Sequence, residues 1–198
     1  MNKPPTILIR TSGRPKGFAR AIKSIQNQTV KCDIIVSIDN KNDFWYVQNH
    51  ECKVIQCTPN LKYRTYWNLY LNDLIRQVQD NFVIILDDDD YLNQPTMIEE
   101  VMTNKVKKSD IIVWRMVWDN GRVIPDYEHF GSIPFERGHI GMPCVCFHSS
   151  MINKIQFDGN RAGDFRFYNA MLDHVDNIHF INKTYIQIGN RGLNGAKE

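Results

Sequence analysis

The sequence predicts an α/β fold, a single-domain α/β/α sandwich with a mostly parallel central sheet. Its 198 residues, 42% hydrophobic and 23% charged, fit one globular domain. In the first half, short β-branched runs of strand length alternate with segments of helical periodicity, which is the pattern of strands joined by crossover helices. Most of these runs lack the alternation of a sheet with one solvated face, as expected for buried parallel strands.

The first half contains four predicted strands and two predicted helices. The helix between the first two strands spans about 17–28, and another helix lies between the last two strands. Right-handed crossovers of this kind place the strands parallel to one another. The predicted strands are 6–9, 33–38, 53–56 and 82–86; the apolar faces of the helices comprise Phe18, Ala21, Ile22 and Ile25, and Trp67, Leu71, Leu74, Ile75 and Val78.

The second half is less regular. A helix is expected to begin near Pro95, which suits a first helical turn. Glycines and prolines recur over 120–143, which indicates a long loop of the kind that often binds substrate. The remaining predictions are a strand at 110–118, a strand at 144–147, a short serine-capped helix at 149–155, a helix at 163–172, and closing strands at 178–181 and 184–188.

Charge and apolar runs exclude several classes of protein. The 24 basic and 22 acidic residues give a formal charge of +2, too small to attract nucleic acid or an anionic membrane. The apolar run before Arg10 has three residues and the run at 82–86 has five, both too short for a signal peptide or a membrane span. We expect a soluble, cytoplasmic protein without membrane insertion; its oligomeric state stays open.

The five cysteines are predicted to be free thiols, because their number is odd and their density is low. The alternative is a zinc site made of Cys52, Cys57, Cys144 and Cys146, although the CxxxxC and CxC spacings differ from those of a zinc ribbon. The six histidines show no metal-ligand spacing. Trp114 and Trp118 lie four apart in a predicted strand, where core packing is the expected role and sugar stacking the alternative.

The segment NFVIILDDDDYL (81–92) ends a predicted strand in four consecutive aspartates. In an extended chain Asp87 and Asp89 would project to one side and Asp88 and Asp90 to the other. Adjacent carboxylates repel one another unless a cation is present, and carboxylates at the carboxyl end of a parallel strand can hold Mg²⁺ or Mn²⁺. The alternative is a solvated acidic loop or a helix cap.

Two other predicted strands end in polar residues. The turn RTSGRPKG (10–17) can offer backbone groups and an arginine to a nucleotide, or serve as an ordinary strand-to-helix turn. Asp39, in SIDN, can accept hydrogen bonds from a base or ribose, or cap a turn. Because parallel strands present their carboxyl ends at one edge, these residues and the acidic run are expected to form one ligand site.

The order PTILIRTSGRP, a helix ending in QNQT, then DIIVSIDN, then NFVIILDDDDYL resembles the opening of inverting glycosyltransferases of the GT-A (Rossmann-like) fold related to family 2. The resemblance covers about the first 95 residues, although the usual PTYNR turn is replaced by RTSGRP. A fainter similarity is to the compact glycosyltransferase domains of large algal DNA viruses, in which case the location would be the host cytoplasm.

The resemblance implies roles for individual residues. Thr11 and Asp39 would contact the base, which is most often uracil in the family. Arg14 would support that pocket, and Arg64 in LKYRTYWN would lie near the base. The acidic run corresponds to a DxD motif: Asp87 would face the ribose or a metal-bound water, Asp89 would bind the metal that bridges the diphosphate, and Asp88 would share either role.

The resemblance also implies a catalytic base in the second half. Family members place an ED pair at the start of a helix, and NRAGDFRFYNAML (160–172) matches in position, which makes Asp164 the candidate. A plain helix cap is the alternative role for Asp164. Gly163 replaces the usual glutamate, so the other acids left open as the base are Asp158, Asp173 and Glu136. Where the family recruits a late histidine to the metal, this chain has Asn190 and Arg191, and Arg191 would close over the diphosphate.

The predicted function is therefore a metal-dependent inverting glycosyltransferase (EC 2.4 class) that uses Mn²⁺ or Mg²⁺. It would move one hexosyl or deoxyhexosyl group from a UDP-sugar to a glycan or other hydroxyl acceptor, with 1–95 as the donor half and 96–198 as the acceptor and catalytic half. The QxxRW signature of processive synthases is absent. The alternatives are a sugar-1-phosphate nucleotidyltransferase, whose GxGTRxxP signature SGRPKG matches poorly, and a catalytically silent nucleotide- or glycan-binding domain.

Overall fold

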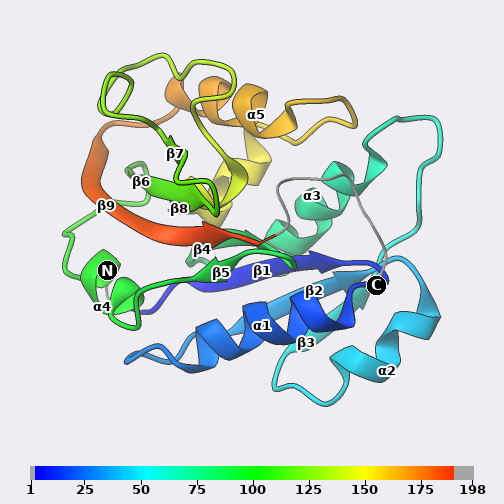
Figure 1. Cartoon of the computed structure of the whole chain (residues 1–198). Coiled ribbons are helices and arrows are strands. Elements are labelled where there is room, and N and C mark those ends of the chain that lie inside the picture. The colour runs from blue at the N-terminus through cyan, green and yellow to red at the C-terminus, as the bar shows by residue number, and fades with distance from the viewer. Residues whose placement is uncertain (1–2, 190–198) are drawn as a thin grey trace.

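The computed structural model describes residues 3–189 (Figure 1). The strands are β1 Thr6–Thr11, β2 Ile34–Ile38, β3 Lys53–Gln56, β4 Phe82–Asp87, β5 Tyr91–Leu92, β6 Ile111–Trp118, β7 Val123–Ile124, β8 Val145–His148 and β9 Ile178–Ile188. The α-helices are α1 Pro15–Gln26, α2 Phe44–Val47, α3 Leu69–Arg76, α4 Met97–Met102 and α5 Gly163–Leu172, and the 3₁₀ helices are η1 Lys41–Asp43, η2 Tyr66–Asn68, η3 Met142–Cys144 and η4 Ser149–Asn153.

All of the strands belong to one sheet, in the order β3-β2-β1-β4-β8-β6-β9-β5, with β7 paired to β6. The four strands β3, β2, β1 and β4 are parallel, as the sequence predicts. The chain moves one way from β1 to β2 and back the other way from β3 to β4. Right-handed crossovers therefore place α1 and α3 on opposite faces of the sheet, as Figure 1 shows. Because β1 and β4 lie at this reversal, a crevice is expected outside their carboxyl ends.

The second half of the sheet has mixed directions. Strand β8 is antiparallel to both β4 and β6, and β9 runs parallel to β6. The closing segment is one continuous strand of eleven residues, although the sequence predicts two strands there. The register of β9 against β6 shifts on both sides of Arg115. This irregular pairing lets β9 continue through the residues at which the sequence predicts a break between two strands. Strand β5 is only two residues long, too short for a periodic signal.

The observed bounds of several helices and of one strand differ from the predicted ones. The predicted helix with Trp67 and Val78 begins as a 3₁₀ turn at Tyr66 and its α-helical part ends at Arg76, so Val78 lies outside it. Helix α5 spans the predicted residues. The predicted helix at 149–155 is the 3₁₀ helix η4, and the short α2 was not predicted. Strand β3 is an edge strand with exposed ends, not a buried one.

The core lies on both faces of the sheet. Buried residues of β1, β4 and β6 pack against the apolar faces of α1 and α3 and against α5. Trp114 is fully buried and its indole Nε1 donates to the Pro143 carbonyl oxygen at 2.8 Å, so core packing is its role. Asn72 of α3 exchanges two hydrogen bonds with the backbone of Phe157, at 2.8 and 2.9 Å. These two buried hydrogen bonds connect the segment before α5 to the half of the fold that contains the parallel strands.

The cysteines are free thiols, as predicted. The alternative zinc site is wrong, because Cys144 and Cys146 lie in and next to β8 whereas Cys52 and Cys57 flank β3. Three strands separate β8 from β3 in the sheet, which corresponds to roughly 19 Å at about 4.8 Å per strand. Among residues 3–189, no helix is both long enough and apolar enough to cross a lipid bilayer.

Candidate functional site

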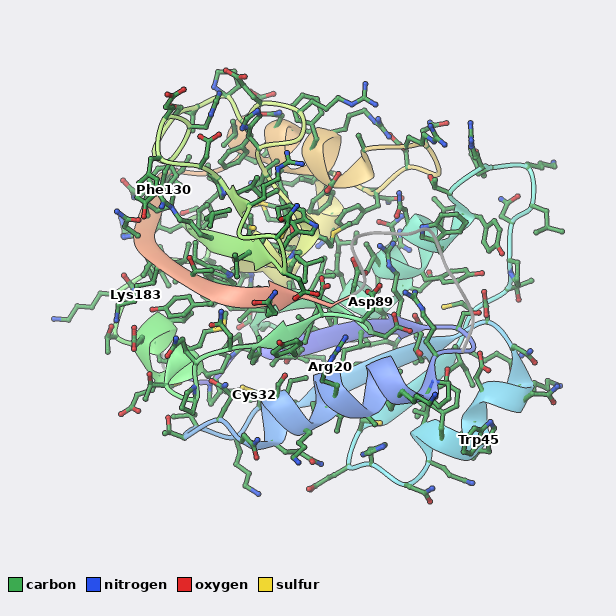
Figure 2. All side chains as sticks on the ribbon, viewed as in Figure 1. Arg20, Cys32, Trp45, Asp89, Phe130 and Lys183 are labelled. Carbon is green, nitrogen blue, oxygen red and sulfur yellow. The ribbon has the colours of Figure 1, made fainter. Side chains whose placement is uncertain are left out.

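The four aspartates form a turn at the carboxyl edge of β4. Asp87 is the last strand residue, and the Asp90 amide donates to the Asp87 carbonyl oxygen at 3.0 Å. The alternation expected for an extended chain is therefore wrong, because the chain leaves the strand after Asp87. We call residues 87–90 the acidic turn. It lies beside the ends of β1 and β5, where Figure 2 labels Asp89.

Arg14 holds two of these aspartates. Its Nη2 lies 2.9 Å from Asp88 Oδ1 and its Nη1 lies 3.0 Å from Asp89 Oδ2. The Asp88 side chain has no exposed surface, and burial raises its pKa to about 7 against the opposing effects of Arg14 and of a hydrogen bond from Thr11. Asp88 pairs with Arg14 inside the turn and is the least accessible of the aspartates that pair with an arginine here. Its expected contact with ribose or metal stays a prediction.

Arg10 connects the acidic turn to α3. Its Nε donates to Asp87 Oδ1 at 2.9 Å and its Nη1 donates to Asn68 Oδ1 at 2.6 Å. The Arg10 and Asp87 side chains are 15% and 26% exposed, so the pair is shielded but reachable. Sequence reasoning did not single out Arg10. The available signal was a charged residue inside an otherwise apolar strand end, just where the RTSGRP turn departs from the family pattern.

Two glycines allow other elements to approach the acidic turn closely. A Cβ on Gly17, in the first turn of α1, would lie 2.9 Å from the Asp88 carbonyl oxygen. A Cβ on Gly189, just after β9, would overlap the Asp89 carbonyl oxygen and the Arg20 guanidinium. Arg20 Nη2 donates to that carbonyl at 2.6 Å, and the Gly189 amide donates to Asp90 Oδ1 at 3.3 Å. The turn is therefore held between α1 and the end of β9.

The residues expected near a base lie at the same edge. Thr11 ends β1 and is buried, with its Oγ1 3.0 Å from the Tyr46 hydroxyl. Asp39 follows β2 and its Oδ2 accepts a hydrogen bond from the Tyr70 hydroxyl at 3.3 Å. The tyrosines therefore orient both polar groups. Their own pKa values are raised by burial, to about 12 for Tyr46, so both remain protonated donors at neutral pH.

Asp164 is the second residue of α5, and charged groups at this edge of the sheet affect its pKa. The charges of Asp87 and Arg10 both act on it, and burial raises the pKa of its carboxyl group. Its Oδ1 accepts a hydrogen bond from the Phe165 amide at 2.8 Å. A partly exposed carboxylate with a raised pKa, beside a second carboxylate, has the character of a general base.

The alternative bases are less suitably placed. Arg166 binds both oxygens of Asp158, at 2.6 and 2.7 Å, and this contact lowers the pKa of Asp158. Asp173 follows the other end of α5, roughly 13 Å from Asp164 at about 1.5 Å per residue. Glu136 contacts His129 in the 120–143 loop, at 3.4 Å. Of the four acids, Asp164 is the one whose environment includes Asp87.

The two remaining predicted arginines are Arg64 and Arg191. Arg64 is exposed in the segment that leads from β3 to η2, and its expected place near the base stays a prediction. Arg191 lies outside the described residues.

The residues of the acidic turn fit a hard divalent cation. Burial, together with repulsion from the neighbouring carboxylates, raises the pKa values of Asp89 and Asp90, so negative charge on this turn is unfavourable without a cation. A cation relieves that repulsion. The turn does not bring three ligand atoms together within residues 3–189. Asp87 and Asp89 are thus suited to a cation that also binds phosphate oxygens, which is how Mg²⁺ is usually held.

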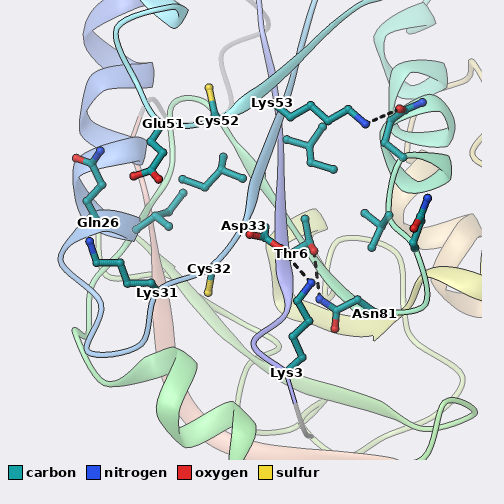
Figure 3. Close-up of a pocket in the computed structure, with 16 residues that line it drawn as sticks. Lys3, Thr6, Gln26, Lys31, Cys32, Asp33, Glu51, Cys52, Lys53 and Asn81 are labelled. Carbon is teal, nitrogen blue, oxygen red and sulfur yellow. Dashed lines mark hydrogen bonds and ion pairs between the residues drawn. The ribbon is translucent and has the colours of Figure 1, made fainter.

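A sizeable cavity lies at the opposite edge of the sheet. It has a volume of about 890 Å³ and is lined by the amino ends of β1, β2 and β3, including Thr6, Ile34 and Lys53 (Figure 3). Lys3 Nζ lies 3.1 Å from Asp33 Oδ2 across its mouth. Ligands of open α/β sheets bind at the carboxyl ends of the strands, so we assign the site to the acidic turn despite the size of this cavity.

Comparison with known proteins supports the assignment of the fold. S. aureus TarS, residues 1–349, superposes with a TM-score of 0.74 at 19% identity, covering 93% of this chain and 60% of the 1–349 chain. Its complex with UDP-GlcNAc gives 0.76 at 18% identity, over 98% and 60%. The mannosyltransferase PcManGT from Pyrobaculum calidifontis, in complex with GDP-Man and Mn²⁺, gives 0.67 at 12% identity, over 97% and 59%.

This chain therefore has the GT-A fold of nucleotide-sugar glycosyltransferases, as the sequence predicts. It spans about 60% of the length of the TarS 1–349 and PcManGT chains and 36% of the longer TarS chain. No protein-family model matches the sequence, and no curated protein matches it.

Proposed function

We propose that this chain is a metal-dependent inverting glycosyltransferase that transfers one hexosyl or deoxyhexosyl group from a UDP-sugar to a hydroxyl group of a glycan or other acceptor. One arrangement carries the proposal: Asp164 of α5 and Asp87 of the acidic turn share one electrostatic environment, with Arg10 bonded to Asp87. An inverting transfer needs a base and a diphosphate site together, and this arrangement supplies both candidates.

The donor nucleotide would bind at the ends of β1 and β2. Asp39 offers a carboxylate beside the Tyr70 hydroxyl, and exposed Arg64 supplies positive charge nearby. Thr11 is buried and contacts Tyr46, so it would form part of the wall of the base pocket. UDP and UDP-GlcNAc occupy the TarS complexes, which favours uracil over other bases here.

Asp87 and Asp89 would hold Mn²⁺ or Mg²⁺ together with the donor diphosphate. A bound divalent cation supplies electrostatic stabilisation of the negative charge on the leaving diphosphate. Arg14 pairs with the Asp89 carboxylate, and Arg20 donates a hydrogen bond to the Asp89 carbonyl oxygen. Both contacts stabilise the conformation of the acidic turn. Arg10 fixes the Asp87 carboxylate.

Asp164 would take the proton of the acceptor hydroxyl on the face of the sugar opposite the leaving diphosphate. The new glycosidic bond forms to the acceptor oxygen as the bond from the sugar to the diphosphate breaks, which inverts the anomeric configuration. Burial and the nearby Asp87 charge raise the proton affinity of Asp164. A higher pKa makes its carboxylate a stronger base than an exposed aspartate.

Titrating UDP in the presence and absence of Mn²⁺ tests the nucleotide site directly. The proposal predicts Mn²⁺-dependent binding, and an equal, weak response in both titrations would overturn it. A screen of sugar nucleotides for Mn²⁺-dependent binding and slow hydrolysis then identifies the donor. Binding of every tested UDP-sugar without hydrolysis or transfer to any acceptor would favour the silent binding domain instead.

A further inference from the structure

A second group of metal-ligating side chains lies in the loop between β7 and η3. Asp126, His129 and His139 each offer a ligand atom, and these atoms lie within 4.8 Å of one another. Within residues 3–189 no other three His, Cys, Asp or Glu side chains are gathered in this way. The spacing in sequence, D-x-x-H followed ten residues later by H, matches no common metal motif.

Asp126 lies at the centre of the group. Its Oδ1 is 2.6 Å from His129 Nδ1, and its Oδ2 is 3.3 Å from His139 Nδ1. The two imidazole rings stack with centroids 3.7 Å apart, so both Nδ1 atoms face the same carboxylate. His139 Nδ1 is shielded from solvent and makes no hydrogen bond with any described residue. Buried polar atoms are almost always partnered, and a metal ion bound between this nitrogen and the Asp126 carboxylate would satisfy it.

Contacts outside the group fix the loop that carries these ligands. The buried Arg115 of β6 places its guanidinium 4.1 Å from the Tyr127 ring centroid and 4.5 Å from that of Phe130. Asn169 of α5 exchanges hydrogen bonds with the backbone of Phe135 at 2.8 and 2.9 Å. The ligands therefore sit on a loop held from two sides, which reduces the entropy cost of assembling a metal site.

The remaining nitrogen of His129 has the partner that a metal-bound histidine requires. His129 Nε2 lies 3.4 Å from Glu136 Oε2. Histidines that bind a metal through one nitrogen almost always donate the other N–H to a carboxylate, a carbonyl or water, which fixes the tautomer and ring orientation. Glu136 is thus placed to orient His129 so that its Nδ1 faces the Asp126 carboxylate, where a metal would bind between them.

The ligand chemistry distinguishes this group from the acidic turn. Two imidazoles with one carboxylate suit Zn²⁺, whereas carboxylates alone suit Mg²⁺ and Mn²⁺. The two places are also separate in space: Phe130, next to His129 in the chain, lies far across the molecule from Asp89 in Figure 2. Zinc–nitrogen bonds of about 2.0–2.1 Å put tetrahedral ligand atoms roughly 3.3 Å apart, which is the separation of His139 Nδ1 and Asp126 Oδ2. His129 Nδ1, at 2.6 Å from Asp126 Oδ1, would exchange that direct contact for a bond to the metal.

We propose that Asp126, His129 and His139 bind one Zn²⁺ ion that fastens the 120–143 loop, with Glu136 orienting His129 and water completing the coordination. This site is independent of the proposed transferase activity, so either can fail without the other. Its role is structural: the ion joins the two ends of a loop segment that has no regular secondary structure between residues 126 and 139.

The test uses the full chain after treatment with a chelator. Co²⁺ serves as the visible probe of the site and Zn²⁺ as its competitor, and thermal unfolding is followed with and without Zn²⁺. We expect one equivalent of Co²⁺ to give an intense d–d band that Zn²⁺ removes, and Zn²⁺ to raise the melting temperature. His129→Ala, His139→Ala and Asp126→Asn should each weaken Zn²⁺ binding at least about 100-fold, since even outer partners cost about 10–100-fold.

Two matched control variants test whether Zn²⁺ binds at Asp126, His129 and His139 and not elsewhere. His174→Ala removes a histidine outside the group, and Asp89→Ala removes an acidic-turn ligand; both should bind Zn²⁺ like the wild type. If a ligand variant fails to fold, Glu136→Gln keeps the test open, with about 10–100-fold weaker binding expected. The proposal is overturned if the wild type gives no Co²⁺ band, if His139→Ala or Glu136→Gln binds as tightly as the wild type, or if Asp89→Ala abolishes binding.

Discussion

Arg10 and Asp87 are register partners on adjacent parallel strands, and their side chains form an ion pair of 2.9 Å at the end of that register. The pair places a positive charge at the point where β4 turns into four aspartates. Because Arg10 also binds Asn68, the same guanidinium connects the sheet to the start of α3. The Arg10 side chain therefore links two strands of the sheet to the segment before α3.

Replacing Arg10 should reveal the strength of this pair. Arg10→Ala is expected to lower the free energy of unfolding by about 1.5–3 kcal/mol, the usual contribution of a hydrogen bond to a charged group. At about 2–4 °C per kcal/mol, the melting temperature should fall by roughly 3–12 °C. A double-mutant cycle with Asp87→Asn measures the coupling. Additive losses in that cycle would show that the two side chains do not interact.

Asp89→Ala should abolish the Mn²⁺-dependent part of UDP binding, because it removes one of the two carboxylates proposed to hold the cation. We expect at least a tenfold weaker affinity in Mn²⁺, measured by calorimetry. Asp33→Ala is the matched control, since this exposed aspartate lies at the opposite edge of the sheet. Unchanged Mn²⁺-dependent binding in Asp89→Ala would remove Asp89 from the metal site.

Asp164→Asn should leave donor binding intact and remove turnover, because asparagine keeps the size and the hydrogen bond from Phe165 but cannot take a proton. A loss of at least about 100-fold in sugar transfer is expected for a general base. Asp173→Asn, which changes an exposed aspartate at the other end of α5, should retain activity. Full activity in Asp164→Asn would mean that another residue is the base.

Gly189→Ala should disturb the acidic turn, because the added methyl group would overlap the Asp89 carbonyl oxygen. We expect weaker Mn²⁺–UDP binding together with a lower melting temperature. Gly141→Ala is the comparison: its methyl group would meet the end of the flexible Met116 side chain, which can adjust more easily than a backbone carbonyl. Equal effects of the two substitutions would contradict the close approach of β9 to the turn.

Acid should weaken the contact between α4 and β9. Hydrogen bonds from Lys183, Tyr185 and Thr96 lower the pKa of Glu100 to about 2. Because the folded-state pKa lies below the ordinary value of 4.5, this contribution to stability is complete above pH 4.5 and is lost as the pH falls toward 2. Denaturant melts between pH 7 and pH 2.5 should therefore show a declining stability.

Glu100→Gln should flatten that decline while costing about 0.5–1 kcal/mol at pH 7, as expected for a partly exposed ion pair. A pH profile that is identical in wild type and Glu100→Gln would assign the acid sensitivity to other carboxylates.

The parallel half of the fold could be predicted because its signals are local. The apolar face of α1 and the buried run of β4 can be detected within a few residues of sequence. The site was less predictable, since its contacts join distant positions: Arg10 with Asp87, and Asp90 with Gly189. The extended-strand assumption failed at Asp88 because a turn begins where the strand ends, and alternation applies only within a strand.

The histidine group illustrates the same limit. Asp126 and His129 are three residues apart, but His139 reaches them only because the loop folds back through Gly131 and Gly138, both at positive φ. A spacing of ten residues through irregular backbone carries no periodicity that a sequence can reveal. By contrast, Asp164 could be proposed because it lies at the start of a helix whose bounds are set by a local pattern.

The contact between the acidic turn and Gly189 has a consequence for biosynthesis. The Asp90 carboxylate receives its amide donor from a residue 99 positions later in the chain. At about 5–20 residues per second, ribosomes need roughly 5–20 s to bridge that interval. During this time the four aspartates have been synthesised, but the end of β9 and Gly189, which contact them in the folded protein, have not. With the proposed metal site, a nascent chain that ends before Gly189 should therefore fail to retain Mn²⁺–UDP, which makes nucleotide capture a reporter of synthesis past Gly189.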